Sequence, residues 1–327
     1  MRRLLSIAGL ALLMAVSFAS AVVRLPYFAL GPGPARAVDP LIDVEAPTYD
    51  SSGRLVITTV RFQPVTALGA LLTWLDPHEA LVAEDVLYPP GLSREEEERR
   101  AISDMDQSKI AAAVVALSHV TDYPRDHGRG ALIEQVGDGC PAEGVLFPGD
   151  LIRRIDGRPV RSAGEARDLI DGVPVREAIA FVVEADGEVT SERLRRGSCA
   201  GSEEPLVGIS LVQPFPFEIS IQSGDIGGPS AGLMWALGLY DALTPEDLTG
   251  GSTIAGTGSI DAEGGVGAIG GILDKVVAAR EAGADILLIP QANEAELAGV
   301  DRGGVRVIAV ATFEEALEAL GAPEPTS

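Results

Sequence analysis

The sequence contains very little lysine. Among its 25 lysine and arginine residues, only Lys109 and Lys275 are lysines. Arginine stays protonated in proteins, whereas a buried lysine can lose its proton near neutral pH. A lysine kept in such a chain is therefore a candidate for proton transfer, which arginine cannot perform.

Acidic residues outnumber basic residues, 48 to 25, and the formal net charge is −23 over 327 residues. Nucleic acids and anionic lipid surfaces are bound by basic patches. The charge therefore argues against both as partners. The length is sufficient for two domains with buried cores.

Cysteine is also scarce, with Cys140 and Cys199 as the only two. Two cysteines do not define a disulfide framework. They could pair if the protein lies outside the cytoplasm, or both could be inert, because spacing alone does not decide pairing.

Charged residues are absent from Leu4 to Val23, directly after Arg2 and Arg3. This length predicts a single transmembrane helix with a cytoplasmic N-terminus. A cleaved signal peptide is the alternative, since Ala-Ser-Ala at 19–21 would suit cleavage. Both interpretations place the rest of the chain outside the cytoplasm. Residues 25–40, which include Gly-Pro-Gly-Pro, are expected to form a linker.

The next part of the chain, residues 41–124, has a mixed pattern. A β-branched strand is expected at 54–60 and a helix at 66–75. The charged run 94–100 predicts a solvated helix face, and apolar spacing at 107–119 predicts a packed helix.

A separate module is expected at residues 125–203. Its signals are a strand at 131–136, a short helix after the turn at 137–144, and a helix capped by Ser162. Together with Cys-Pro-Ala at 140–142 and Pro-Gly-Asp-Leu-Ile at 148–152, they resemble a PDZ domain. The resemblance implies a small barrel-like sheet with two helices.

PDZ domains bind peptide ends by adding them as a strand to a sheet edge. The resemblance implies a loop that holds the terminal carboxylate, and the candidate residues are Leu206, Val207, Gly208 and Ile209. This loop would follow the module, as in circularly permuted bacterial PDZ domains. An ordinary strand start is the alternative.

Ser230 lies at the start of an apolar segment that predicts a helix to about Leu243. A helix N-terminus offers unpaired N–H groups and a partial positive charge, which favour an alkoxide and an oxyanion. Gly227 and Gly228 allow a substrate backbone to approach, and Pro229 stiffens the turn. The alternative is an ordinary helix N-cap.

A nucleophilic serine needs a base, and histidine is a poor candidate here. The residues Gly-Pro-Ser-Ala-Gly match the nucleophile elbow of α/β-hydrolases, but that fold places its histidine after the serine. His78, His119 and His127 all precede Ser230. A chymotrypsin-like order stays formally open, although none of the three has a recognisable catalytic context.

The sequence also contains no His-Glu-x-x-His motif and no P-loop. Lys275 is the remaining base, and its apolar neighbours indicate the burial needed to populate a neutral amine. A helix-surface lysine beside Asp274 is the alternative.

Four segments carry a second resemblance: 228–232, Thr-Gly-Ser-Ile at 257–260, the run 269–275, and 284–290. They resemble the proteolytic domain of Lon proteases, most of all the membrane-anchored bacterial subset with a PDZ domain and no ATPase module. The resemblance implies a nucleophile at Ser230, a general base at Lys275, and a threonine at Thr257 that hydrogen-bonds the lysine. It also implies peptide substrates, no cofactor or metal, and a homo-oligomer such as a hexameric ring.

There is one departure from the family pattern. Many ATP-dependent members carry an acidic residue three positions before the serine, where this chain has Gly227. Asp225 is the nearest carboxylate, and it could substitute, cap the turn or face solvent.

The sequence thus predicts an α+β protein: a Lon-like α/β domain with an inserted PDZ domain, preceded by a transmembrane helix. The predicted divisions are an anchor (1–24), a linker (25–40), the two Lon-like parts (41–124 and 204–322) and the PDZ domain (125–203). The predicted function is a membrane-tethered, ATP-independent serine endopeptidase. A catalytically silent peptide-binding adaptor is the alternative.

Overall fold

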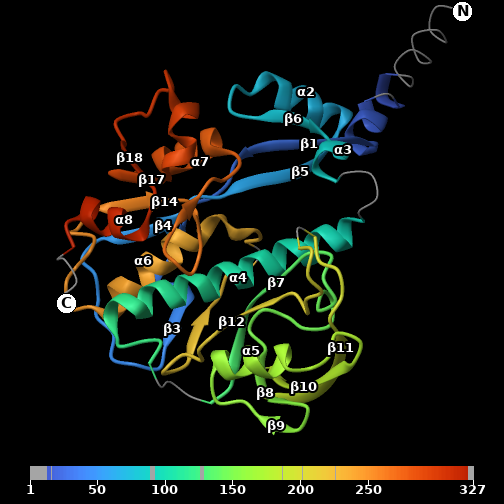
Figure 1. Ribbon diagram of the computed structural model, residues 1–327. Helices are drawn as coiled ribbons and strands as arrows, with labels where there is room; N and C mark the ends of the chain where they lie inside the picture. The colour runs from blue at the N-terminus through green and yellow to red at the C-terminus, as the bar shows by residue number, and fades with distance from the viewer. Residues whose placement is uncertain are drawn as a thin grey trace, which may run out of the picture.

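The fold was analysed in a computed structural model that describes residues 13–15, 17–88, 93–125, 129–185, 187–200, 202–224 and 226–322. Figure 1 shows three parts: a mixed α/β body, a PDZ-like module below it, and a small sheet near the N-terminus. Each part is built from segments that the sequence patterns favour locally.

The body is organised around a five-stranded sheet in the order β18-β17-β14-β4-β2. Parallel pairing joins β4, β14, β17 and β18, and β2 is antiparallel to β4. The central strands are apolar along their length, as expected where helices cover both faces. Their bounds are β2 Arg36–Ala37, β4 Arg54–Ile57, β14 Thr253–Gly256, β17 Ile286–Pro290 and β18 Arg306–Val310.

Alternate strand residues face two different cores. On one face Leu55 and Ile254 pack with Trp235 of α6 and with residues of α4 and α8. On the other face Val56 and Ala255 pack with α7. The helices are α4 Arg94–Val120, α6 Gly232–Leu243, α7 Ile272–Glu281 and α8 Phe313–Leu320.

Short elements complete the body. The pairs β3–β13 and β15–β16 are antiparallel. Their bounds are β3 Ile42–Val44, β13 Ile219–Ile221, β15 Ser259–Ile260 and β16 Val266–Gly267, and the 3₁₀ turns are η1 Asp39–Leu41, η2 Pro229–Ala231 and η3 Gln291–Leu297.

The PDZ-like module has its own core, which includes Ile133, Leu146 and Phe181. Its sheet has the order β11-β10-β8-β7-β12, with β9 paired to β8, so β12 is an edge strand. The elements are β7 Ala131–Val136, β8 Leu151–Ile155, β9 Arg158–Pro159, α5 Ala163–Asp171, β10 Ala178–Ala185, β11 Glu188–Arg195 and β12 Ile209–Val212. The sheet thus continues beyond residue 203, the end expected from the sequence.

This module is inserted into the body. β4 precedes it in the chain and β14 follows it, yet the two strands pair side by side. The same holds for β3 and β13. Residues before and after the module therefore form one fold.

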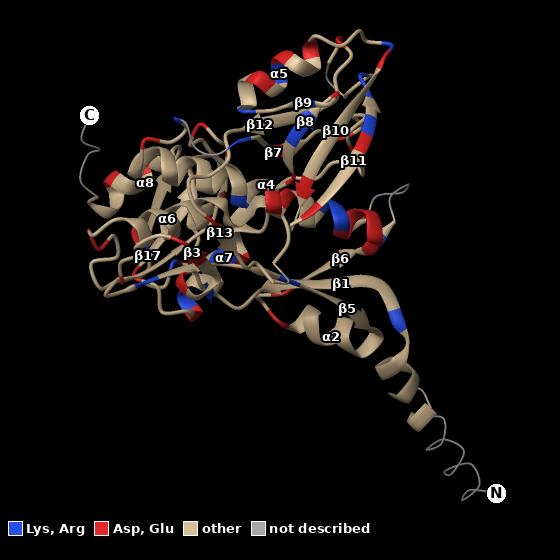
Figure 2. Cartoon of the chain, turned by 90° about the horizontal axis from the view of Figure 1, so that it is seen from below, with Lys and Arg blue, Asp and Glu red and all other residues tan. Residues whose placement is uncertain are grey.

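The third part is the sheet β5-β1-β6 with helices α2 and α3. Figure 2 shows α2 without a charged residue, near the described helical segment that precedes β1. The bounds are β1 Arg24–Pro32, β5 Val60–Thr66, α2 Ala67–Leu75, β6 Ala80–Ala83 and α3 Glu84–Leu87.

Two local expectations were wrong. Residues 25–40 are not a linker, because β1 forms the central strand of this sheet and a Cβ on Gly33 would lie 2.3 Å from Thr59 Oγ1. The short PDZ helix predicted with the turn at 137–144 is absent, because residues 137–150 form turns and irregular backbone in which Gly144 adopts a φ of 72° that helices do not use.

Within the described ranges, no helix is both long enough and apolar enough to cross a membrane. Residues 1–12 and 16 of the predicted anchor, which spans 1–24, lie outside those ranges.

Candidate active site

Ser230 lies in η2, which leads directly into α6. Gly228 before it has φ 77° and ψ 161°, a backbone conformation open essentially to glycine. Pro229 has no N–H, so the first backbone donor of this helical segment belongs to Ser230. The half-buried Ser230 therefore stands where a helix start favours negative charge.

The backbone of this turn is held from two sides. The Ser230 carbonyl accepts hydrogen bonds from Gly258 N at 2.8 Å and Thr257 Oγ1 at 3.0 Å. The Pro229 carbonyl accepts one from Ser108 Oγ at 3.0 Å. Sequence analysis placed Ser108 on a helix but did not identify this contact. The hydroxyl of Ser108 beside an apolar helix face was the feature that could have indicated it.

Lys275 lies in the first turns of α7, and its side chain is only 3% exposed. Its Nζ lies 2.9 Å from Ser230 Oγ and donates to Thr257 Oγ1 at 2.7 Å. Desolvation by burial lowers the pKa of Lys275 to about 8. A substantial neutral fraction near physiological pH follows from that value.

Thr257 follows the carboxyl end of β14 and is fully buried. Its hydroxyl proton is directed to the Ser230 carbonyl, so its lone pairs are left to accept from Lys275. An amine held by one N–H in this way can turn its lone pair toward the serine hydroxyl. The structure therefore brings together Ser230, Lys275 and Thr257, three of the four residues named as catalytic candidates.

The second lysine has a different environment. Lys109 Nζ lies 3.0 Å from Asp106 Oδ1, one turn away on α4. A partly exposed ion pair of this kind is common on helices and stabilises little. Lys275, by contrast, contacts hydroxyl groups.

The structure describes two histidines, and neither is recorded in contact with Ser230. The ring of His119 packs edge-on against Phe313, and its Nε2 lies 3.3 Å from Glu314. His78 is exposed beside α2. His127 lies outside the described residues.

The turn before the serine packs against α4. Gly228 N donates to the Ala101 carbonyl at 2.9 Å, and a Cβ on Gly227 would lie 3.3 Å from the Ala101 Cβ. Gly227 and Pro229 are exposed and can be reached by a substrate. Asp225 lies outside the described residues.

Residues 206–209 lead into the edge strand β12 of the PDZ-like sheet. Leu206 pairs with Gly197, and the Val207 and Gly208 carbonyls accept from Ala142 N and Gly137 N. On its outer side β12 is contacted by α5, since Arg167 Nη2 donates to the Leu211 carbonyl. A peptide added to β12 would meet this contact.

Cys140 and Cys199 form a disulfide with a Cα–Cα distance of 4.4 Å. It lies beside Gly208, where an added Cβ would come within 2.1 Å of the Cys140 Cβ. The disulfide thus fixes the loop that precedes β12.

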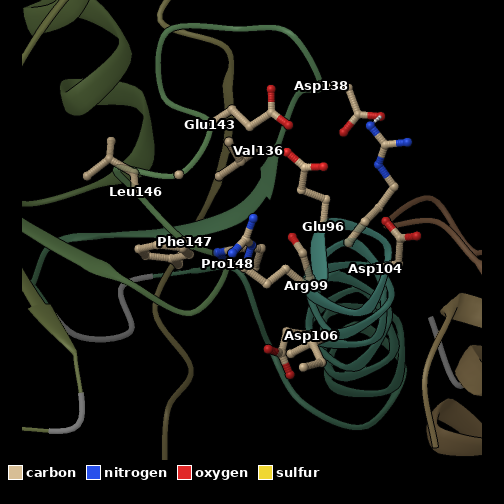
Figure 3. Close-up of a pocket in the computed structure, with 14 residues that line it drawn as sticks. Glu96, Arg99, Asp104, Asp106, Val136, Asp138, Glu143, Leu146, Phe147 and Pro148 are labelled. Carbon is tan, nitrogen blue, oxygen red and sulfur yellow. Dashed lines mark ion pairs between the residues drawn. The ribbon is translucent and has the colours of Figure 1, made fainter. Parts of the chain in front are cut away.

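A cavity of about 400 Å³ separates the start of α4 from the PDZ-like module (Figure 3). Carboxylates dominate its polar lining, and the Arg100 guanidinium lies 3.4 Å from Asp138. Burial, and secondarily Asp138, raise the pKa of Asp104. Across the part of the chain that is described, no cluster of three histidine, cysteine or acidic residues could hold a metal.

The buried Lys275 amine thus lies within hydrogen-bonding distance of the Ser230 hydroxyl at a helix start and of the Thr257 hydroxyl after β14. Comparison with known proteins specifies the family. Residues 218–321 match the family model described as the Lon protease (S16) C-terminal proteolytic domain, and residues 132–185 match that of the PDZ domain. The protein thus carries a Lon-type S16 proteolytic domain and a PDZ domain.

Individual relatives of this chain are also Lon proteases. Lon protease 2 of Bacillus subtilis is 35% identical over 144 residues, covering 42% of this chain and 25% of the relative. The Lon protease of Clostridioides difficile is 46% identical over 70 residues, covering 21% of this chain and 9% of the relative. This chain therefore spans a quarter or less of the length of these two relatives.

Among solved structures, the PDZ domain of the SdrC-like protein from Listeria monocytogenes is similar to part of the chain. It is 29% identical, with a TM-score of 0.24, and the match covers 25% of this chain and 87% of that domain.

Proposed function

We propose that this protein is a serine endopeptidase in which Ser230 is the nucleophile and Lys275 the general base. The observation that carries the proposal is the 2.9 Å contact between Lys275 Nζ and Ser230 Oγ in a water-poor site. A buried amine with a pKa near the working pH is suited to proton transfer.

The reaction would proceed by acyl transfer. As Ser230 Oγ attacks the peptide carbonyl carbon, its proton passes to neutral Lys275 Nζ. The ammonium then protonates the leaving amine, the C–N bond breaks, and an ester to Ser230 remains. Lys275, neutral again, takes a proton from water as the water oxygen attacks the ester carbon. The bond from that carbon to Ser230 Oγ then breaks, the Lys275 ammonium returns its proton to Ser230 Oγ, and the carboxylic acid product is released.

The residues around the dyad would support these steps. Backbone N–H groups at the start of η2 are positioned to hold the oxyanion, because the helix start concentrates positive potential there. Thr257 positions the amine through its hydroxyl. The exposed Gly227 and Pro229 would line the path of the substrate backbone.

The PDZ domain would recognise a peptide terminus of the substrate. Edge strand β12 and the loop 206–209 are the elements that strand addition requires. Because α4 contacts both the turn before Ser230 and the cavity next to this domain, a bound substrate would be presented close to the catalytic residues.

The proposal includes tethering to the cell membrane by residues 4–23, with both domains outside the cytoplasm. The uncharged run after Arg2 and Arg3 supports this placement, and so does the disulfide, because such bonds persist in oxidising compartments. Turnover without ATP is proposed from the resemblance to the bacterial subset that carries a PDZ domain and no ATPase module. Assembly into a homo-oligomeric ring is also proposed, by analogy with Lon-like domains.

Two measurements test the proposal. Purified protein without ATP should cleave an unfolded, fluorescently labelled protein, and Ser230→Ala and Lys275→Arg should abolish cleavage, since arginine keeps its charge and cannot act as a base. A serine-directed phosphonate should label Ser230 covalently in the parent and not in Ser230→Ala. Wild-type cleavage by either variant would refute the mechanism, and complete absence of labelling would favour a peptide-binding adaptor.

A further inference from the structure

Helix α2 presents its apolar side to the outside. Leu68, Leu71, Leu72 and Leu75 have the i, i+3, i+4, i+7 spacing of one helix face, with Trp74 beside them. These five side chains, here called the α2 face, are 44–74% exposed. Contiguous exposed apolar surface of this kind marks a site that contacts another apolar phase.

The polar side of the same helix points inward. Thr73 is buried, and its hydroxyl donates to Glu79 at 2.9 Å. Glu79 in turn pairs with Arg61 at 2.8 Å. A helix on a water-facing surface has the opposite arrangement, with apolar residues inside and polar residues outside.

The N-terminal apolar segment joins the fold at this place. The exposed residues Leu13, Met14, Phe18, Val22 and Val23 lead directly into β1. β1 is the strand between β5 and β6, the two strands that α2 connects. Figures 1 and 2 agree in placing α2 near the described helical segment that precedes β1.

We propose that the α2 face is a second membrane contact, which inserts into the interfacial region of the bilayer that the N-terminal segment enters. This inference rests on the tethering part of the proposed function. Trp74 suits a position at the level of the lipid headgroups, since tryptophan is enriched at membrane interfaces. The helix also carries no charged residue that would have to be desolvated.

The contact would be apolar in character and not electrostatic. With a net charge of −23 the protein is repelled by anionic lipid, so neutral lipid is expected to suffice. Added phosphatidylglycerol should not strengthen the contact, and added salt should not weaken it.

Docking of α2 would also orient the active site. A Cβ on Gly271, the N-cap of the Lys275 helix, would lie 2.9 Å from Val60 Cγ2 at the start of β5. The sheet that carries α2 therefore abuts the catalytic helix. Two attachments, one through the N-terminus and one through α2, would fix the height and tilt of the site above the bilayer.

Trp74 provides a direct test. The chain has two tryptophans, and Trp235 is completely buried, so the difference between the parent and Trp74→Phe isolates the signal of Trp74. The full chain is reconstituted in phosphatidylcholine vesicles with and without brominated acyl chains. We expect brominated lipid to quench Trp74, and acrylamide in the water to quench it poorly.

A pair of variants tests the face itself. Leu72→Glu combined with Leu75→Glu should abolish the brominated-lipid quenching of Trp74 and expose it to acrylamide. Val189 on β11 of the PDZ domain has a similar exposure, and Val189→Glu should change neither the brominated-lipid quenching nor the acrylamide quenching of Trp74. Phosphonate labelling of Ser230 in all variants checks that the fold and the proposed catalytic site are intact.

Three outcomes would overturn the inference. Trp74 could be open to acrylamide while the chain floats with vesicles, in which case tethering stands and only the α2 contact fails. Protection from both quenchers would mean that a second copy or another protein covers the face. A chain that does not float with vesicles would remove the tether and the α2 contact together, and phosphonate labelling would still test the peptidase separately.

Discussion

Lys275 Nζ lies 2.9 Å from Ser230 Oγ, although the residues are 45 positions apart and belong to helical segments on opposite faces of the central sheet. They meet at the carboxyl end of β14, where Thr257 lies between the two layers. The carboxyl edge of parallel strands is the usual location of sites in open α/β sheets.

Activity should depend on the protonation of Lys275. Its pKa is lowered to about 8, so kcat/KM is expected to rise about tenfold per pH unit below that value and to level off above it. A pH profile measured with an unfolded substrate checks this. A profile that is flat from pH 6 to 9 would contradict a lysine base.

The same shift has a consequence for stability. In the unfolded chain the lysine keeps its proton up to its ordinary pKa of 10.5, so between pH 8 and 10.5 the unfolded state binds more protons. The contribution of Lys275 to folding stability therefore increases with pH in that window. Denaturant titrations should show this slope in the parent and its reduction in Lys275→Met.

Thr257 is expected to position the base. Thr257→Val removes the hydroxyl that accepts from Lys275 and donates to Ser230, so kcat should fall by about ten- to a hundredfold with little change in KM. Thr257→Ser keeps the hydroxyl and should retain most activity. A shifted pH profile in Thr257→Val would separate positioning of the amine from simple loss of packing.

Gly228 should be needed for its backbone conformation. Its φ is 77° and nothing lies within 4 Å of the position that a Cβ would take, so Gly228→Ala introduces strain without a clash. We expect a loss of stability of about 1–3 kcal/mol and reduced labelling of Ser230. Gly270→Ala is the matched control, because its Cβ would also have open space and its φ is not positive.

The disulfide should stabilise the PDZ domain. Cys140 and Cys199 are separated by 59 positions, and closing a loop of that size is worth about 4 kcal/mol by the chain-entropy estimate. Replacing both by alanine should lower the unfolding midpoint in denaturant and weaken peptide binding through the loop at 206–209. Unchanged stability under reducing conditions would contradict this role.

Arg167 should compete with peptide for β12. Its guanidinium donates a hydrogen bond to the Leu211 carbonyl, and a peptide added as a strand would need that carbonyl as a hydrogen-bond acceptor. Arg167→Ala is therefore expected to tighten the binding of C-terminal peptides by about fivefold, the equivalent of one hydrogen bond. Arg176→Ala, an exposed arginine of the same domain, should leave the affinity unchanged.

Local sequence patterns predicted some elements of the fold correctly and misjudged others. The strand at 131–136 and the helix at 66–75 are close to the observed β7 and α2 because each has a clear local period. Residues 25–40 were misjudged because glycine and proline are common to linkers and to strand ends, and only pairing with β5 and β6 makes β1 a strand.

The scarcity of lysine and the glycines before Ser230 can be read directly from the sequence, and they made Ser230 and Lys275 candidates. The resemblance to Lon proteases added Thr257 and the family. The sequence could not show that Lys275 is buried, that Cys140 and Cys199 are paired, or that Ser108 holds the turn. Each of these depends on which distant segments pack together. Burial sets the pKa of the amine, and burial is a property of the assembled layers around β14 and not of any local run of residues.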